Sequence, residues 1–187
     1  MTMTKNRLYH MVLAGVLCAV GIVVPMFMPR VVLGPMSFTL ASHVAVFLGM
    51  FISPAVAVAV CIGTTLGFFL TTPAIIALRA ASHIVFAFFG AMYLKHHPET
   101  INKPVSSTMF SFIIALMHAA AEVLIVSPFF LSGALFTPEQ LANGFVTSVI
   151  LLVGLGTVIH SMLDYSISVL IWKPLCIAIP ELHKHED

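Results

Sequence analysis

Five ionisable side chains lie within long apolar stretches of the sequence, where charged groups are costly and by default mark a site. They are His43, Arg79, His83, His118 and Glu122. Counted from the nearest proline at about 1.5 Å per residue, all five fall roughly 9–15 Å below the same membrane surface. Groups of this kind face protein or water rather than lipid. Together they could bind a small polar solute.

Helical spacing supports a shared cavity for these residues. One face of a helix carries a polar stripe of Arg79, Ser82, His83, Phe86 and Gly90, and His118 and Glu122 are four residues apart on the next helix. Two structural alternatives stay open: Arg79 and Glu122 could only neutralise each other, and His118 and Glu122 could form a structural hydrogen bond.

A third stripe, on the last predicted helix, comprises Thr157, His160, Ser161, Asp164 and Ser168. Polar side chains at this spacing form contacts between membrane helices more often than a path for protons. We therefore expect this stripe to hold helices together.

Several chemistries are absent from the sequence. It contains no glycine-rich loop ending in Lys-Ser or Lys-Thr, no His-Glu-x-x-His or His-x-x-x-His pair and no Gly-x-Ser-x-Gly. The three cysteines, Cys18, Cys61 and Cys176, lack the spacing of metal ligands. We predict that the chain is not an enzyme and needs no metal or other cofactor, so active transport would draw on an ion gradient or on another subunit.

The composition defines the elements that position these residues. Of 187 residues, 60% are hydrophobic and 8% charged, which excludes a soluble domain, and a net charge of +1 argues against nucleic acid as a partner. The continuous apolar runs predict a single all-α membrane domain, 1–187, with six transmembrane helices. Prolines and charges place them at about 8–27, 36–52, 55–70, 74–94, 105–126 and 141–172.

Basic residues predict the orientation of the bundle. With six helices, six basic residues lie at one side and two at or near the other; the six are Lys5, Arg7, Lys95, Lys103, Lys173 and Lys184. Both termini are therefore expected in the cytoplasm. The first helix also carries small residues four apart, Ala14 with Cys18 and Gly15 with Ala19, which would let another helix approach closely.

The chain resembles the substrate-binding S components of energy-coupling factor (ECF) vitamin transporters over nearly its whole length. The resemblance rests on the six predicted helices, the small-residue stripe, the apolar loop after the first helix and four segments. Those segments, Ser37–His43, Phe51–Pro54, Gly63–Phe69 and Leu78–His83, resemble a subgroup assigned to niacin or pantothenate.

The resemblance implies a function and a set of partners. An S component binds its vitamin from outside, docks on a transmembrane coupling protein with two ATPase subunits, topples in the bilayer and releases the vitamin inside. By this resemblance the chain is a multi-pass protein of a bacterial plasma membrane. Alternatives from other classes are a stand-alone proton-coupled transporter, with Glu122 or Asp164 as the proton carrier, and a membrane enzyme or assembly factor that uses the histidines.

The resemblance also suggests roles for particular residues. Arg79 would bind the vitamin's carboxylate because a buried guanidinium offers paired donors. His43, His83, His118, Glu122 and Ser82 would complete the substrate site, and Phe86 would stack on a ring. Met28, Arg30 and Leu33 would belong to a lid, and the partner would dock on Ala14, Gly15, Cys18 and Ala19.

Overall fold

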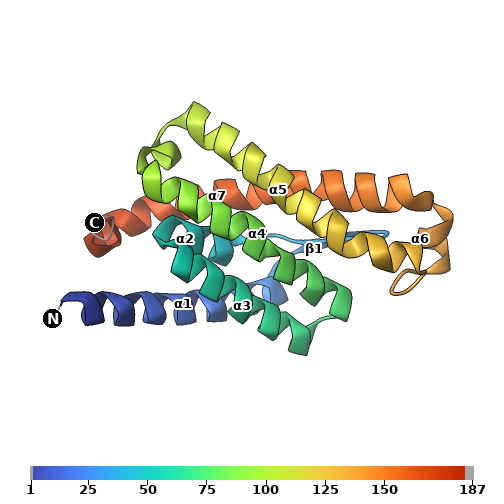
Figure 1. Cartoon of the computed structure of the whole chain (residues 1–187), viewed down its shortest axis with the longest axis horizontal. Helices are drawn as coiled ribbons and strands as arrows, with labels where there is room; N and C mark the ends of the chain where they lie inside the picture. Colours follow the sequence, from blue (N-terminus) through green and yellow to red (C-terminus); the bar gives the residue numbers. More distant parts are fainter. Residues whose placement is uncertain (1, 184–187) are drawn as a thin grey trace.

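The structure is a computed structural model that describes residues 2–183, and it consists of helices with one short β-hairpin (Figure 1). The long helices are α1 (Thr2–Phe27), α3 (Pro54–Thr71), α4 (Ala74–His96), α5 (Pro104–Leu131) and α7 (Gly156–Ala178), the last preceded by the π-helical segment η2 (Val146–Leu155). Within the described residues, five helices are long and apolar enough to cross a membrane. The prediction of an all-α multi-pass membrane protein is thereby confirmed.

The segment predicted as a second membrane helix over 36–52 has a different structure. It forms a hairpin of β1 (Arg30–Leu33) and β2 (Met36–Thr39), then a turn and the short helix α2 (Val44–Ile52). Pro29 precedes the hairpin, and Gly34 has a φ of +56° in its two-residue turn, a conformation that suits glycine. At about 1.5 Å per residue, the nine residues of α2 cannot cross a bilayer core of about 30 Å.

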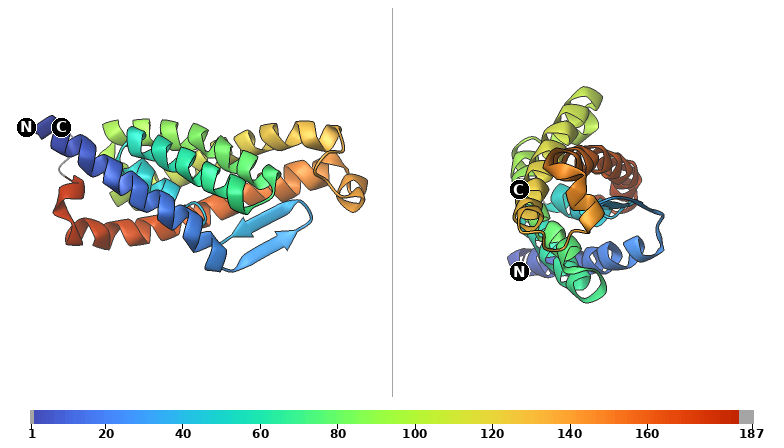
Figure 2. Two further views of the ribbon diagram at one scale, coloured as in Figure 1. Left: turned by 90° about the horizontal axis from the view of Figure 1, so that it is seen from below. Right: turned by 90° about the vertical axis from the view of Figure 1, so that its right-hand side faces the viewer.

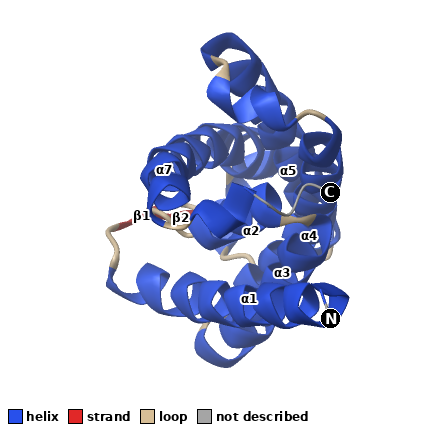
Figure 3. Cartoon of the chain, turned by 90° about the vertical axis from the view of Figure 1, so that its left-hand side faces the viewer, coloured by secondary structure: helices blue, strands red, loops and turns tan. Residues whose placement is uncertain are grey.

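Helix α2 lies in the middle of the bundle, with the long helices around it (Figure 3). Its residues from Val44 to Met50 are all buried. The hairpin and α2 together return the chain to the end of the bundle from which α1 departs. The start of α1 and the end of α7 therefore lie at the same end (Figures 1 and 2). This agrees with the expected placement of both termini on one side, although Lys184, counted for that side, lies outside the described residues.

The last helical region begins before its predicted span of about 141–172 and is not one continuous α-helix. Helix α6 (Pro138–Ala142) starts with a capping box in which Thr137 and Gln140 exchange side chain–backbone hydrogen bonds. A break at Gly144, with φ of +78°, follows before the π-helical run. Helix α5 continues past its predicted end at Val126, through Pro128 to Leu131. The 3₁₀ turns η1 (Pro98–Asn102) and η3 (Pro180–His183) complete the fold.

Helices α1 and α3 meet along a seam of glycines. A Cβ added at Gly63 would collide with the Cys18 side chain, and one added at Gly67 would collide with Ile22. Small residues four apart are the usual means by which membrane helices approach closely. The predicted docking residues of α1 therefore lie on two different faces of the helix. Cys18 faces α3, whereas Gly15 faces outward with nothing within 4 Å of its Cβ position.

We predict that Gly63→Ala destabilises the protein and that Gly15→Ala does not. Overpacking a tight contact costs typically about 1–3 kcal/mol, whereas alanine in place of an unobstructed helical glycine gains up to about 1 kcal/mol. Thermal unfolding of the two purified variants in one detergent measures the difference. Equal midpoints for the two variants would show that α1 and α3 are not held by this seam.

Candidate binding site

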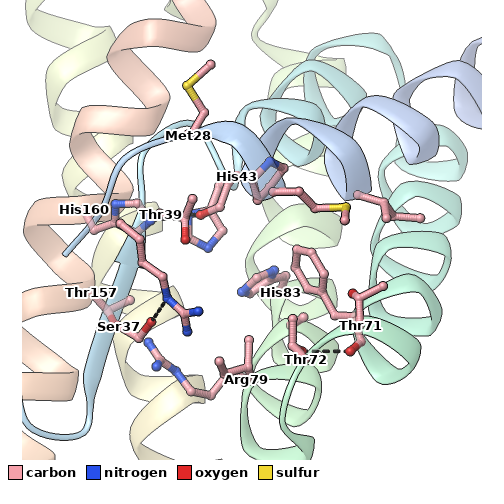
Figure 4. A pocket seen from close by; sticks show the side chains of 18 of the residues that line it. Met28, Ser37, Thr39, His43, Thr71, Thr72, Arg79, His83, Thr157 and His160 are labelled. Carbon is pink, nitrogen blue, oxygen red and sulfur yellow. Dashed lines mark hydrogen bonds between the residues drawn. The ribbon is translucent and has the colours of Figure 1, made fainter. Parts of the chain in front are cut away.

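A cavity of about 290 Å³ opens beside the hairpin, between the end of α1, the end of α3 and the start of α4. Figure 4 shows the labelled side chains converging on it from several elements, among them His43, Arg79, His83 and Thr157. The lid residues Met28 and Arg30 also line it. Residues far apart in sequence therefore form one chamber.

A buried ion pair lies in the wall of the cavity. Arg79 Nη2 donates to Glu122 Oε2 at 2.8 Å, and Thr157 Oγ1 donates to the same oxygen at 2.6 Å. The Arg79 Nε–H is buried and makes no hydrogen bond. The pair thus neutralises both charges, as one sequence interpretation expected, and still leaves the guanidinium with donors for a ligand.

Four imidazole rings cluster beside this pair. The ring of His43 lies 4.6 Å from that of His83, 4.7 Å from that of His118 and 4.8 Å from that of His160, centroid to centroid. The rings come from the N-terminal end of α2 and from α4, α5 and α7. The similar depths predicted for His43, His83 and His118 therefore correspond to contact in the fold, and His160 joins them from another predicted stripe.

The carboxylate of Asp164 caps the turn, residues 40–43, that leads into α2. Its oxygens accept hydrogen bonds from the backbone N–H groups of Ala41, at 2.8 Å, and His43, at 2.9 Å. The same carboxylate lies 3.0 Å from His43 Nδ1. Asp164 has no exposed surface. The polar stripe on the last helix thus joins helices, as expected, and fixes the position of His43.

Comparison with known proteins identifies a close homologue. The chain is 38% identical over 183 residues to the niacin transporter NiaX of Lactococcus lactis subsp. cremoris. The aligned region covers 96% of this chain and 81% of that protein. The chain belongs to the family of this niacin transporter. No protein-family model and no solved structure matches it. The resemblance seen in the sequence, to niacin- or pantothenate-type vitamin transporters, is confirmed.

The fold places most of the predicted site residues together, but four of them do not line the cavity: His118, Ser82, Phe86 and Leu33. Phe86 has no exposed surface and packs behind the histidines, with its ring 4.5 Å from that of His118. Ser82 turns back to donate to the carbonyl of Arg79 in its own helix. Leu33 lies exposed at the hairpin turn and does not line the cavity. In this geometry Phe86, Ser82 and Leu33 do not line the cavity, and their contacts with a ligand stay predictions.

The cavity of this niacin-transporter homologue also includes residues that sequence reasoning did not assign to binding. The sequence pattern assigns His160 and Thr157 only to a stripe between helices, and it gives no binding role to Ser37, Thr71 and Thr72. The alternation of Ser37 and Thr39 with apolar neighbours is the sequence signal that could have revealed β2 and its polar face. His160 stacks on Phe38 of the same strand, with centroids 4.7 Å apart.

We expect Asp164→Ala to lower the stability of the protein strongly and Asp164→Asn to lower it less. The alanine leaves two buried N–H groups without an acceptor, at about 1–3 kcal/mol each, whereas the amide retains one acceptor oxygen. Ser168→Ala is the matched control, because Ser168 Oγ bonds only the carbonyl of Asp164 in its own helix. Thermal unfolding in detergent measures all three. An Asp164→Ala variant as stable as Ser168→Ala would contradict the capping role.

Proposed function

We propose that the chain is the substrate-specific S component of an ECF importer and that it binds niacin, in its carboxylate form, in the cavity beside the hairpin. The observation that carries the proposal is the pair of arginines on the cavity wall. Arg79 keeps unused donors while paired with Glu122, and Arg30 lines the same space from the hairpin. Two guanidinium groups there face the single carboxylate of Glu122, which favours an anionic ligand.

The dimensions and lining of the cavity favour a compact acid. Its volume of about 290 Å³ is at the small end of the range for ligand sites, roughly 300–1,000 Å³. Imidazole rings and threonine hydroxyls offer partners for a ring nitrogen. Niacin, a pyridine ring with one carboxylate, suits this space better than the longer, flexible pantothenate. The name of the homologue, a niacin transporter, points the same way.

The energy for uptake is proposed to come from partner ATPase subunits through a coupling protein, because the sequence has no ATP-binding loop. A proton-coupled transporter working alone is less favoured by the geometry. Its two candidate proton carriers both have structural partners: Asp164 holds the end of α2, and Glu122 binds Arg79 and Thr157.

The proposed docking surface for the coupling protein is the outward face of α1 around Gly15 and Ala19. Both residues are exposed, as are their apolar neighbours Val12, Val16 and Val23, whereas Ala14 and Cys18 face the protein. Within the span Arg7–Phe27 only 11% of the most apolar window is buried. The small residues on this face would allow a partner helix to come close to the α1 backbone.

Substitution of Arg79 tests the binding site. Arg79→Lys should weaken niacin binding by about tenfold to a hundredfold, the loss expected when a charged, bidentate hydrogen bond worth about 1.5–3 kcal/mol is removed while the charge stays. Arg30→Lys is the matched variant on the exposed hairpin, and it should weaken niacin binding less than Arg79→Lys does. Wild-type protein should bind nicotinamide weakly, because the amide lacks the anionic charge. Calorimetry on purified protein measures each affinity.

The double variant Arg79→Met with Glu122→Gln tests whether Arg79 binds the niacin carboxylate or only neutralises Glu122. If Arg79 only balances Glu122, this neutral pair should fold and bind niacin as well as the wild type. Retained affinity in that variant, or in Arg79→Lys, would contradict the carboxylate anchor while leaving the family assignment intact.

Replacement of Gly15 or Ala19 by tryptophan tests the docking surface. The bulky ring should prevent close helix approach, so niacin uptake in cells and co-purification of ATPase subunits should fall at least tenfold, while niacin binding by the isolated chain stays unchanged. Val105→Trp, an exposed position on α5, is the control. Concentrative niacin uptake by the purified chain alone in vesicles with a proton gradient would favour the proton-coupled alternative instead.

A further inference from the structure

Three of the clustered histidines form a triangle at the inner wall of the cavity. His43, His83 and His118 come from α2, α4 and α5, and their ring centroids are 4.6, 4.7 and 4.8 Å apart. All three side chains are buried, and His118 has no exposed surface. His43 and His83 line the cavity, while His118 lies behind them. Three imidazoles from separate elements thus face one small volume.

The hydrogen-bond pattern leaves ring nitrogens of this triangle without partners. His43 uses Nδ1 on Asp164, which leaves its Nε2 available. Neither ring nitrogen of His118 makes a hydrogen bond, although the residue is fully buried. An unsatisfied buried polar atom costs about 1–3 kcal/mol, so this arrangement calls for an occupant that binds imidazole nitrogens.

The second oxygen of the nearby carboxylate faces the same triangle. Glu122 Oε2 is occupied by Arg79 and Thr157, whereas Oε1 lies 3.4 Å from His118 Nε2 and 3.7 Å from His83 Nε2. The two carboxylates of Glu122 and Asp164 balance the two guanidinium groups of Arg79 and Arg30 around the cavity. The inference of a ligand therefore rests on the unpaired ring nitrogens and on the placement of Oε1 beside them.

We propose that His43, His83 and His118 bind a divalent transition-metal ion of the zinc class. Imidazole nitrogens are ligands that suit zinc, copper, nickel and iron. Three imidazoles on a tetrahedral metal, at metal–nitrogen distances of about 2 Å, place their ring centroids roughly 5 Å apart, close to the separations found here. Their ligand nitrogens lie within 4.8 Å of one another and need to close to about 3.3 Å.

The surroundings supply what a histidine metal site requires. The Asp164 carboxylate at His43 Nδ1 fixes that ring and directs its other nitrogen toward the triangle, as carboxylates do behind zinc-bound histidines. Glu122 Oε1 adds negative charge beside two of the ligands. The fourth coordination position faces the cavity, because His43 and His83 line it.

A second possible set, His43, His160 and Asp164, shares His43 with the first. Its carboxylate already accepts hydrogen bonds from two backbone N–H groups at the start of α2. Metal binding there would compete with the cap of a buried helix. The structure therefore favours the triangle, and His160 provides a control that lies equally close to His43.

The test is metal binding by the full-length purified chain without vitamin. The protein should carry a tag without histidine, and four of the five histidines outside the cluster, His96, His97, His183 and His185, should be changed to glutamine to lower background. After chelation and dialysis against Zn²⁺, elemental analysis should find one ion per chain. His83→Gln and His118→Gln should each weaken Zn²⁺ binding at least tenfold, whereas His160→Gln should keep it.

Two further measurements keep the proposal falsifiable if a variant folds poorly. Co²⁺ added to the parent protein should give the visible absorption bands of a tetrahedral site, and Zn²⁺ should remove them. Zn²⁺ should also raise the thermal unfolding midpoint of the parent protein and of His160→Gln, but not that of His118→Gln. The assignment would be overturned if the parent protein bound no more Zn²⁺ than His118→Gln does. It would also be overturned if His160→Gln and His118→Gln lost Zn²⁺ affinity equally.

Discussion

The hold of Asp164 on the turn before α2 is the interaction on which the rest of the site depends. Backbone N–H groups inside a membrane bundle have no water to satisfy them, and each unsatisfied group costs several kcal/mol. One buried carboxylate on α7 accepts from both Ala41 and His43, which lead into α2. Its negative charge also lies near the positive end of the helix dipole. This contact fixes the point at which the short second helix begins.

The short helix in turn makes room for the cavity. The hairpin takes the place of the missing turns of a full second span, and its strand β2 brings Ser37 and Thr39 to the cavity wall. Gly156 allows this strand to pack closely, because a Cβ there would collide with Met36 and Phe38. The buried pair of Arg79 and Glu122 then stabilises the fold and can also bind a ligand, because the guanidinium keeps unbonded donors after it pairs with the carboxylate.

The long helices and the grouping of polar residues at similar depths could be predicted from the sequence. The directions in which those side chains point from each helix could not. Prolines and charges marked most helix boundaries, whereas the segment from Met36 to Ile52 is apolar enough to conceal a hairpin followed by a short helix. Phe86 shares a face with Arg79 yet lies behind His83 and His118. The histidine triangle has no spaced motif in the sequence, because its members come from three separate elements, and only their similar predicted depth suggests a shared site.

The π-helical run before α7 gives a different kind of constraint. Over Val146–Leu155 the backbone turns more slowly per residue than an α-helix does, so the run contains more residues per turn. A π-helical turn holds about one residue more than an α-helical turn. A residue lost from this run can therefore be absorbed when a wide turn tightens to an α-helical one, which leaves Thr157 and His160 facing the cavity. A residue lost from an α-helix would instead turn everything beyond it by about 100°. The run thus separates the length of the chain before it from the direction of the polar side chains after it.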